Sequence, residues 1–286
     1  MIRKILILFT VVGVSCFLSS CNKEEEMGPS IFDTTPPIRT ALDQWIYQNL
    51  TIPHNLEITY KWNYTESEMT RNLTPPKEAE AEAFIKDVLK QAWIEPYVKI
   101  AGRNFFNGSS PKQIMLVGTT AYNSTGTITL GTAQAGRKVV IYEINDYNKS
   151  NKDRLRRYMK TIHHEFTHIV NQNQRFQPEF ELVTPGEYRT DWNNATAAWC
   201  REFGFITPYS SSSPSEDFAE MTAVMLTTSL TEWRKMIDVD PTNANAIASL
   251  KKKEELVVLY FKTVWGFDIY TLQAEMESAI NKIVNN

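Results

Sequence analysis

The feature that most constrains the fold is a run of apolar residues at three- and four-residue intervals between Asn151 and Asn173. Such spacing places the side chains along one face of an α-helix, and that face must pack against a core. The stripe consists of Leu155, Tyr158, Met159, Ile162, Phe166, Ile169 and Val170. His164 and His168 fall on the opposite face. Ser150 and Asp153 have the spacing of a capping box, which predicts that the helix begins there.

The residues displayed on that opposite face read H-E-x-x-H from His164 to His168. Two imidazoles one helical turn apart can bind a single Zn²⁺ at about 2.0 to 2.1 Å, and Glu165 between them can accept a proton from a water that the metal activates. Three of the four histidines in the chain lie in this stretch. We therefore predict one zinc ion, with Glu165 as the catalytic base. His163 has no histidine partner one turn later, so it is expected to contact a ligand or to lie at the surface.

A catalytic zinc site needs a third protein ligand, and two downstream carboxylates are candidates. Glu187 lies in the segment T-P-G-E-Y, where no apolar periodicity fixes its position. Glu216 begins the segment E-D-F-A-E-M, whose apolar residues recur at helical spacing. Because helices hold ligands more rigidly than loops do, Glu216 is the favoured third ligand, and Glu187 is the alternative.

The residues around Glu216 bear on its role. The segment S-P-S-E from Ser213 to Glu216 has the spacing of a capping box with proline at the first helical position, and a carboxylate that caps a helix needs no metal. Glu220 follows one turn after Glu216, so we predict that it accepts the free N–H of a ligand imidazole, that of His164. Asp217 points about 100° away from this face and is not a candidate ligand.

Length and composition allow a large core and exclude one class of partner. The 286 residues suit one large domain or two closely packed ones, and 42% of them are hydrophobic. The formal net charge of −3 offers no basic surface for a phosphate backbone, so nucleic acid is not an expected partner. The partner has to be inferred from the site.

The N-terminal segment predicts export rather than a folded element. Arg3 and Lys4 precede an apolar run that is too short for a stable membrane span, so we predict a signal peptide over residues 1–20. The segment ends in L-S-S-C, which resembles the lipobox of bacterial lipoproteins, and Cys21 would then carry a lipid anchor. The alternative is an ordinary secretory signal with an incidental cysteine. Residues 21–36 lack apolar periodicity and are expected to form a flexible tether.

Apolar patterns before the H-E-x-x-H helix predict a mixture of helices and strands. Residues 37–50 and 75–100 have helical spacing, whereas residues 56–64 alternate as a half-buried strand does. The core stripe expected in the second helix is Phe84, Val88, Leu89, Trp93 and Tyr97. Short runs of period two follow at residues 113–118, 127–130 and 138–144. They predict a small, mainly antiparallel sheet, in which Val139–Ile144 is either an internal strand or an exposed edge that pairs with an extended peptide.

The chain after the H-E-x-x-H helix predicts further helices. These are expected at residues 232–237, 245–265 and 270–284. The charged run Lys251–Glu255 is expected on a solvated face. Together these patterns predict an α+β fold over residues 37–286, with a mixed part at 37–174 and a mostly helical part at 175–286.

Three motifs taken together resemble those of the gluzincin class of zinc peptidases. They are H-E-F-T-H, G-F-I-T-P-Y (Gly204–Tyr209) and E-D-F-A-E-M. More closely, the chain is similar to zinc metallohydrolase lipoproteins that Bacteroidetes encode beside outer-membrane substrate importers. The L-S-S-C segment, Trp45-Ile46, Pro75-Pro76 and the L-G-T-A segment at 130–133 also fit that group, so the resemblance covers most of the mature chain.

The resemblance implies a zincin-like fold and a zinc metallopeptidase that acts on peptide or protein substrates. It also implies an outer-membrane lipoprotein, at the cell surface or on the periplasmic side, with importer components as further partners. In the lethal-factor branch of gluzincins, a glutamate at the position of Glu216 binds zinc, and a tyrosine seven residues earlier, here Tyr209, faces the metal. A phenol there could donate its O–H to a developing oxyanion. The alternative is that Tyr209 packs beside Pro208 in a loop.

A different class of function also fits the pattern. The chain could be a non-catalytic lipoprotein of a nutrient import system, which captures peptide or glycan and keeps a vestigial or structural zinc site. The presence of Glu165 favours the enzyme, because a structural site needs ligands but no base.

Overall fold

The apolar stripe predicted between residues 75 and 100 forms the first large part of the core. The computed structural model describes residues 38–63, 71–122, 128–129, 131–134, 137–238 and 243–286, and in it residues 78–100 form one continuous helix. It consists of α4 (Glu78–Phe84), the π-helical η2 (Ile85–Ile94) and α5 (Glu95–Ile100). At most 1% of the surface is exposed for each residue of the predicted stripe, Phe84, Val88, Leu89, Trp93 and Tyr97.

Shorter elements flank this long helix. The chain enters through α2 (Ala41–Ile46), the π-helical η1 (Tyr47–Thr51), α3 (Ile52–His54) and the strand β1 (Glu57–Thr59). The helix α6 (Arg103–Ser109) follows α5. Residues 41–286 form one compact unit. The predicted signal peptide, tether and Cys21 lie outside the described residues. None of the helices in the described ranges combines the length and the apolar character that a membrane span requires.

The main sheet is mostly parallel. Its strands are β1, β2 (Gln113–Leu116), β5 (Gly131–Gln134) and β6 (Lys138–Ile141), in the order β1-β2-β6-β5. β1 and β6 each run parallel to β2, and only β5 is antiparallel to its neighbour β6. A separate antiparallel pair is formed by β3 (Ala121–Tyr122) and β4 (Ile128–Thr129).

The prediction of an α+β fold is therefore confirmed, but the prediction of a mainly antiparallel sheet is wrong. β1 and β2 are separated by the long α4–α5 helix, and a helical crossover of this kind joins parallel strands. Between β2 and β6 the chain makes the β3–β4 arm and β5, so β6 starts from the same end of the sheet as β2. β6 is hydrogen bonded on both sides, so the alternative of an internal strand is confirmed for residues 139–141 and the alternative of an exposed edge is wrong.

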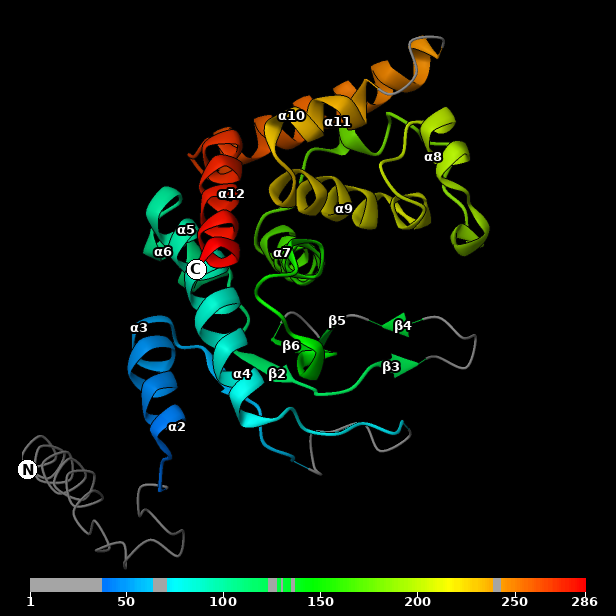
Figure 1. The fold of residues 1–286 in the computed structure, drawn as a ribbon. Coiled ribbons are helices and arrows are strands. Elements are labelled where there is room, and N and C mark those ends of the chain that lie inside the picture. The colour runs from blue at the N-terminus through cyan, green and yellow to red at the C-terminus, as the bar shows by residue number, and fades with distance from the viewer. Residues whose placement is uncertain (1–37, 64–70, 123–127, 130, 135–136, 239–242) are drawn as a thin grey trace, which may run out of the picture. The chain divides into compact units, whose positions relative to one another are not determined.

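The central helix α7 (Lys152–Asn173) carries the H-E-x-x-H motif between the sheet and a later helix, α9 (Pro214–Thr227) (Figure 1). All seven residues of its predicted stripe are buried. The helix is capped by Asn151, whose side chain accepts the backbone N–H of Arg154 at 3.0 Å. The predicted capping box at Ser150 is wrong, because Ser150 belongs to the preceding turn, where its N–H donates to the side chain of Asn148.

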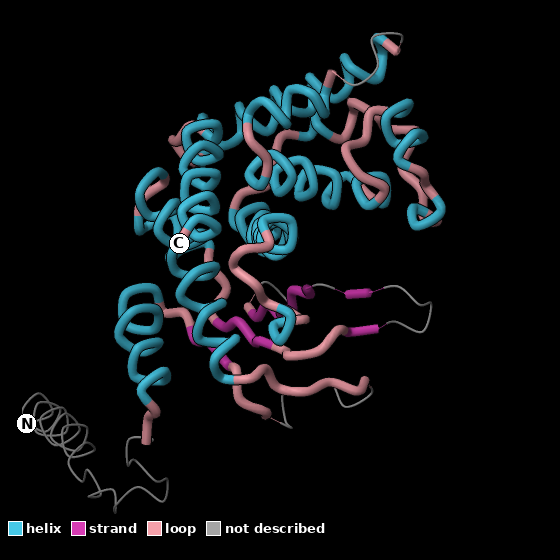
Figure 2. The backbone as a smooth tube through the Cα atoms, viewed as in Figure 1, coloured by secondary structure: helices cyan, strands magenta, loops and turns pink. Residues whose placement is uncertain are grey.

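The chain after α7 contains only helices and loops in its described part, whereas the strands all precede α7 (Figure 2). The 3-10 turn η3 (Ile144–Asp146) precedes α7, and three others follow it: η4 (Pro178–Phe180), η5 (Trp192–Asn194) and η6 (Tyr209–Ser212). The remaining helices are α8 (Ala197–Phe203), α10 (Leu230–Ile237), α11 (Ala244–Val264) and α12 (Ile269–Asn285). The three C-terminal helices expected from periodicity are thus present, each within about two residues of its expected bounds.

The prediction that the charged run Lys251–Glu255 forms a solvated face is wrong for two of its members. Lys253 is 0% exposed and Glu254 is 6% exposed. Both fall three or four positions from Leu250 on α11, so they share the apolar side of the helix that packs into the core. The Lys253 ammonium donates to the backbone carbonyl of Gly204 at 2.8 Å and pairs with Asp217.

Candidate metal centre

The packing of α7 against α9 brings His164, His168 and Glu216 together. Nε2 of His164 lies 2.9 Å and Nε2 of His168 lies 3.1 Å from Oε2 of Glu216. The two Nε2 atoms lie 3.1 Å from each other. Among the residues that the structure describes, no other group of three His, Cys, Asp or Glu side chains comes close enough to share an ion. The two histidine turns and a carboxylate far along the chain therefore meet at one point.

The donor atoms of this triad fit a zinc ion. A tetrahedral zinc with bonds of about 2.0 to 2.1 Å separates its ligand atoms by roughly 3.3 to 3.4 Å, so a small outward movement of the three side chains would admit the ion. Two imidazole nitrogens and one carboxylate oxygen form the His₂Glu set of a catalytic site, which leaves a fourth position open. The side chains of His168 and Glu216 are 18% and 24% exposed, so the centre is accessible to solvent from one side.

The N-terminus of α9 leaves the Glu216 carboxylate available. The hydroxyl of Ser213 accepts the backbone N–H of Glu216 at 3.3 Å, and Pro214 stands at the first helical position. The serine therefore caps the helix, while the Glu216 side chain turns toward the imidazoles. Glu187, the alternative ligand, is not part of this group and lines a separate hollow beside Glu202.

The electrostatics of the triad favour a positive charge at its centre. Burial alone would lower the pKa of His164, but the carboxylates of Glu216 and Glu220 outweigh it and raise that pKa to about 9. Burial would raise the pKa of Glu216, yet the two imidazoles hold it well below its ordinary value. The two carboxylates therefore favour the protonated form of His164 when no other cation is present, and a divalent cation can take the place of that proton.

Glu220 lies behind His164, on the side away from Glu216. Its Oε1 is 3.0 Å from Nδ1 of His164, and its side chain is 3% exposed. Its other oxygen accepts the Lys160 ammonium at 2.7 Å and the Thr207 hydroxyl at 2.5 Å. Against the effect of burial, His164 and Lys160 lower the pKa of Glu220 to about 2. The carboxylate is thus ionised and placed to orient the imidazole.

Tyr209 and Glu165 complete the surroundings of the triad. The Tyr209 ring lies 5.5 Å from the His164 ring, between centroids, and burial and then the carboxylate of Glu216 raise the pKa of its phenol. Trp192 packs edge-on against Tyr209 at 4.7 Å. Glu165 is half-buried, and its charge acts on both His164 and Tyr209. A carboxylate and a phenol therefore stand beside the triad.

The same architecture occurs in known proteins. A family model described as "Putative zinc-binding metallo-peptidase" matches residues 36–270. The chain belongs to this family. A crystal structure of a putative zinc-binding metallo-peptidase from Bacteroides caccae is similar, with 32% sequence identity and a TM-score of 0.74, over 86% of this chain and 93% of that one. No curated protein matches the chain. The zinc metallo-peptidase resemblance expected from the motifs is confirmed.

His163 departs from its predicted place. It was expected to contact a ligand or to lie at the surface, but it is 0% exposed and points into the core. Its Nδ1 lies 3.3 Å from the hydroxyl of Tyr97, and burial lowers its pKa to about 3. The prediction failed because His163 falls one position from His164 and so, at about 100° per residue, turns toward the stripe.

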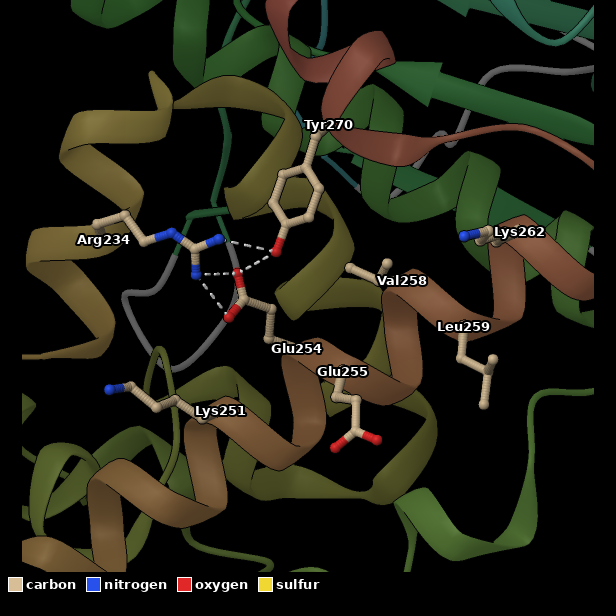
Figure 3. Close-up of a pocket in the computed structure, with 8 residues that line it drawn as sticks. All are labelled: Arg234, Lys251, Glu254, Glu255, Val258, Leu259, Lys262 and Tyr270. Carbon is tan, nitrogen blue, oxygen red and sulfur yellow. Dashed lines mark hydrogen bonds and ion pairs between the residues drawn. The ribbon is translucent and has the colours of Figure 1, made fainter.

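A hollow of about 420 Å³ between α10, α11 and α12 lies on elements other than the two ligand helices (Figure 3). Its centre is the carboxylate of Glu254, which accepts hydrogen bonds from Arg234, Tyr270 and Trp233. Figure 3 shows Arg234 and Tyr270 turned toward that carboxylate. Because these polar groups satisfy one another, we interpret the cluster as a clamp between three helices rather than as a second site.

Three residues around the metal centre were not found from the sequence. Trp192 lies in a loop without periodicity, and Thr207 was part of a motif but had no assigned role. Lys160 stands one turn before His164, and this spacing was the only sign in the sequence that it could lie near the site. The sign is weak, because a lysine on a polar helix face is usually solvated. Their roles depend on α9 and on the 204–209 segment, whose positions only the tertiary structure gives.

Proposed function

We propose that this protein is a zinc-dependent peptidase that hydrolyses peptide bonds with Glu165 as the general base. The observation that carries the proposal is the convergence of His164, His168 and Glu216 on one point, with a carboxylate and a phenol beside it. A bound zinc would supply polarisation of the scissile carbonyl and activation of the attacking water. The three ligand side chains would hold the ion and leave room for substrate.

Side chains of the protein carry out the proton transfer, the stabilisation of the oxyanion and the orientation of the ligand imidazole. Glu165 accepts the proton of the attacking water and later delivers it to the leaving amine. An ordinary phenol is protonated at neutral pH, and burial raises the pKa of Tyr209 further, so Tyr209 can donate a hydrogen bond to the oxyanion of the tetrahedral intermediate. Glu220 holds the His164 ring in a fixed orientation.

Partial exposure of the triad supports an enzyme over a structural or vestigial metal site. A structural zinc is usually enclosed by four protein ligands, whereas this group has three and opens to solvent. A protein that only captures peptide or glycan would have no need of a base beside the ion. On the L-S-S-C sequence and the motif resemblance, we also propose that Cys21 anchors the chain to the outer membrane, on its surface or periplasmic side, with importer components as partners.

The test is cleavage of a mixed peptide library, with zinc content measured on the same samples. The wild-type chain should cleave, a chelator should abolish cleavage, and added zinc should restore it. Glu165→Gln should keep its zinc and lose turnover by about 10² to 10⁴-fold, because it cannot accept a proton. Glu202→Gln, in an exposed glutamate, is the matched control and should behave as wild type. A zinc-loaded wild type that cleaves nothing would favour the binding protein, and an active, zinc-loaded Glu165→Gln would exclude the assigned base.

A further inference from the structure

The two oxygens of the Glu220 carboxylate have different neighbours. Oε1 lies 3.0 Å from Nδ1 of His164. Oε2 accepts the ammonium of Lys160 at 2.7 Å and the hydroxyl of Thr207 at 2.5 Å. One oxygen thus serves the imidazole, while the other is anchored by two donors.

The donors come from two different parts of the chain. Lys160 precedes His164 by one turn of α7, so both side chains can reach the same carboxylate on α9. Thr207 lies in the segment that leads into Tyr209, and its backbone N–H and hydroxyl are bonded to Ser210 on the far side of that tyrosine. Glu220 therefore connects the histidine helix, the Glu216 helix and the Tyr209 segment.

A buried carboxylate at this place needs such anchors. The Glu220 side chain is 3% exposed, so water cannot replace a lost partner freely. Removing one member of a buried charged pair leaves the other uncompensated, and the freed group then moves or changes its bonding. If Oε2 were released, the carboxylate could rotate away from His164, and Nε2 of that ring would lose its fixed direction.

We propose that Lys160 and Thr207 are positioning residues of the metal centre. They hold Oε2 of Glu220 so that Oε1 stays at Nδ1 of His164, and this keeps Nε2 of His164 directed at the position shared with His168 and Glu216. The proposal rests on the proposed function for its site, but zinc binding tests it without any cleavage assay. Partners that orient a ligand imidazole typically change metal affinity by about 10 to 100-fold when they are removed.

The first experiment compares two lysines on the same helix. Lys160→Met should weaken the affinity for zinc, measured by competition with a chromogenic chelator, by about tenfold. Lys152→Met is the matched control, because Lys152 begins α7 and donates to the side chain of Asn281, away from the triad. It should leave the affinity unchanged. Lys160→Arg should restore most of the loss, since a guanidinium can also donate to Oε2.

The second experiment removes one hydroxyl. Thr207→Val keeps the side-chain shape, so it should fold and lower the zinc affinity less than Lys160→Met does. It should also lower kcat with KM unchanged, because the Tyr209 segment loses its tie to Glu220. Thr263→Val is the control, since that hydroxyl is exposed and bonds only within α11.

The outcomes separate the two proposals. Equal zinc affinities for Lys160→Met, Lys152→Met and wild type would overturn the positioning role of Lys160, and an unchanged Thr207→Val would overturn that of Thr207. Melting of the metal-free chains shows whether each variant folds, and if Lys160→Met does not, Lys160→Arg and Thr207→Val decide. A wild type that binds zinc but cleaves nothing defeats only the proposed function, whereas one that binds no zinc defeats both.

Discussion

Lys253 and Asp217 form an ion pair in which both side chains are 0% exposed, with 2.7 Å between Nζ and Oδ2. The hydroxyl of Tyr188 donates to the same oxygen at 3.0 Å. Asp217 follows Glu216 directly in α9, so this pair lies immediately behind the proposed third ligand. It ties α11 to the start of the helix that presents Glu216.

Removing the lysine should therefore destabilise the whole fold. Lys253→Met leaves the Asp217 carboxylate buried without its counter-charge, and we expect a loss of about 3 to 5 kcal/mol in the free energy of unfolding. Urea unfolding at neutral pH measures it. Lys251→Met, which removes a lysine that is 53% exposed, should change that free energy little. The double variant Asp217→Asn, Lys253→Met should be more stable than Lys253→Met alone. Equal stability of the two single lysine variants would contradict the interpretation.

Substitution of two glutamates, one at a time, tests which of them is the third zinc ligand. Glu216→Gln should weaken zinc binding by more than the roughly 100-fold that marks the upper range for residues outside the ligand set. Glu187→Gln should leave it unchanged, because Glu187 lines a separate hollow. Isothermal titration of the metal-free proteins gives both values. The assignment would be reversed if Glu187→Gln were the variant that lost its zinc.

Tyr209→Phe should separate catalysis from metal binding. Loss of the phenol O–H removes one donor to the oxyanion, and we expect kcat to fall by about 10² to 10³-fold. KM and zinc affinity should stay near the wild-type values, because the ring still packs between His164 and Trp192. Steady-state kinetics on a cleaved library peptide, with zinc content measured in parallel, gives the answer. An unchanged kcat would leave Tyr209 with a packing role only.

Acid should weaken one contact between α7 and α10 in a predictable way. Arg156 donates to both oxygens of Glu232, and together with the backbone of Ser229 it lowers the pKa of Glu232 from 4.5 to about 2. Because the folded pKa is below the unfolded value, the stabilisation is fully present above pH 4.5 and disappears as the pH falls toward 2.

The corresponding variant is Glu232→Gln. The Glu232 side chain is 45% exposed, so solvent screens the pair, and we expect a loss of only about 1 kcal/mol at pH 6. Urea unfolding of wild type and variant between pH 6 and pH 3 should show the two free energies converging as the pH decreases. A difference that stays constant across this range would mean that the charge of Glu232 is not responsible.

The sequence patterns predicted the parts of the molecule that depend on local periodicity. The α7 stripe, the long helix around Trp93 and the C-terminal helices all follow from spacing, and so does the display of His164 and His168 on one helix face. Periodicity also favoured Glu216 over Glu187, since only Glu216 begins a helix with an apolar side. The structure brings the Glu216 carboxylate to the two imidazoles.

The rest depended on partners far away in the chain. Whether two strands run parallel or antiparallel depends on the segment that connects them. The short apolar runs around Val139 contain no information on how those connecting segments pass over the sheet. Lys253 stands in a run of charged residues, so nothing nearby distinguishes it as the one that meets Asp217. Lys160 and Thr207 matter only because Glu220 lies between them. Such side chains have no local signature.

Glu216 on α9 lies 52 positions after His164 and 48 positions after His168, both of which are on α7. An ion bound there would form a removable cross-link between α7 and α9. Its occupancy should then control how readily the segment between α7 and α9 is nicked by a protease. Scarcity of zinc in the surroundings would thus shorten the lifetime of the molecule.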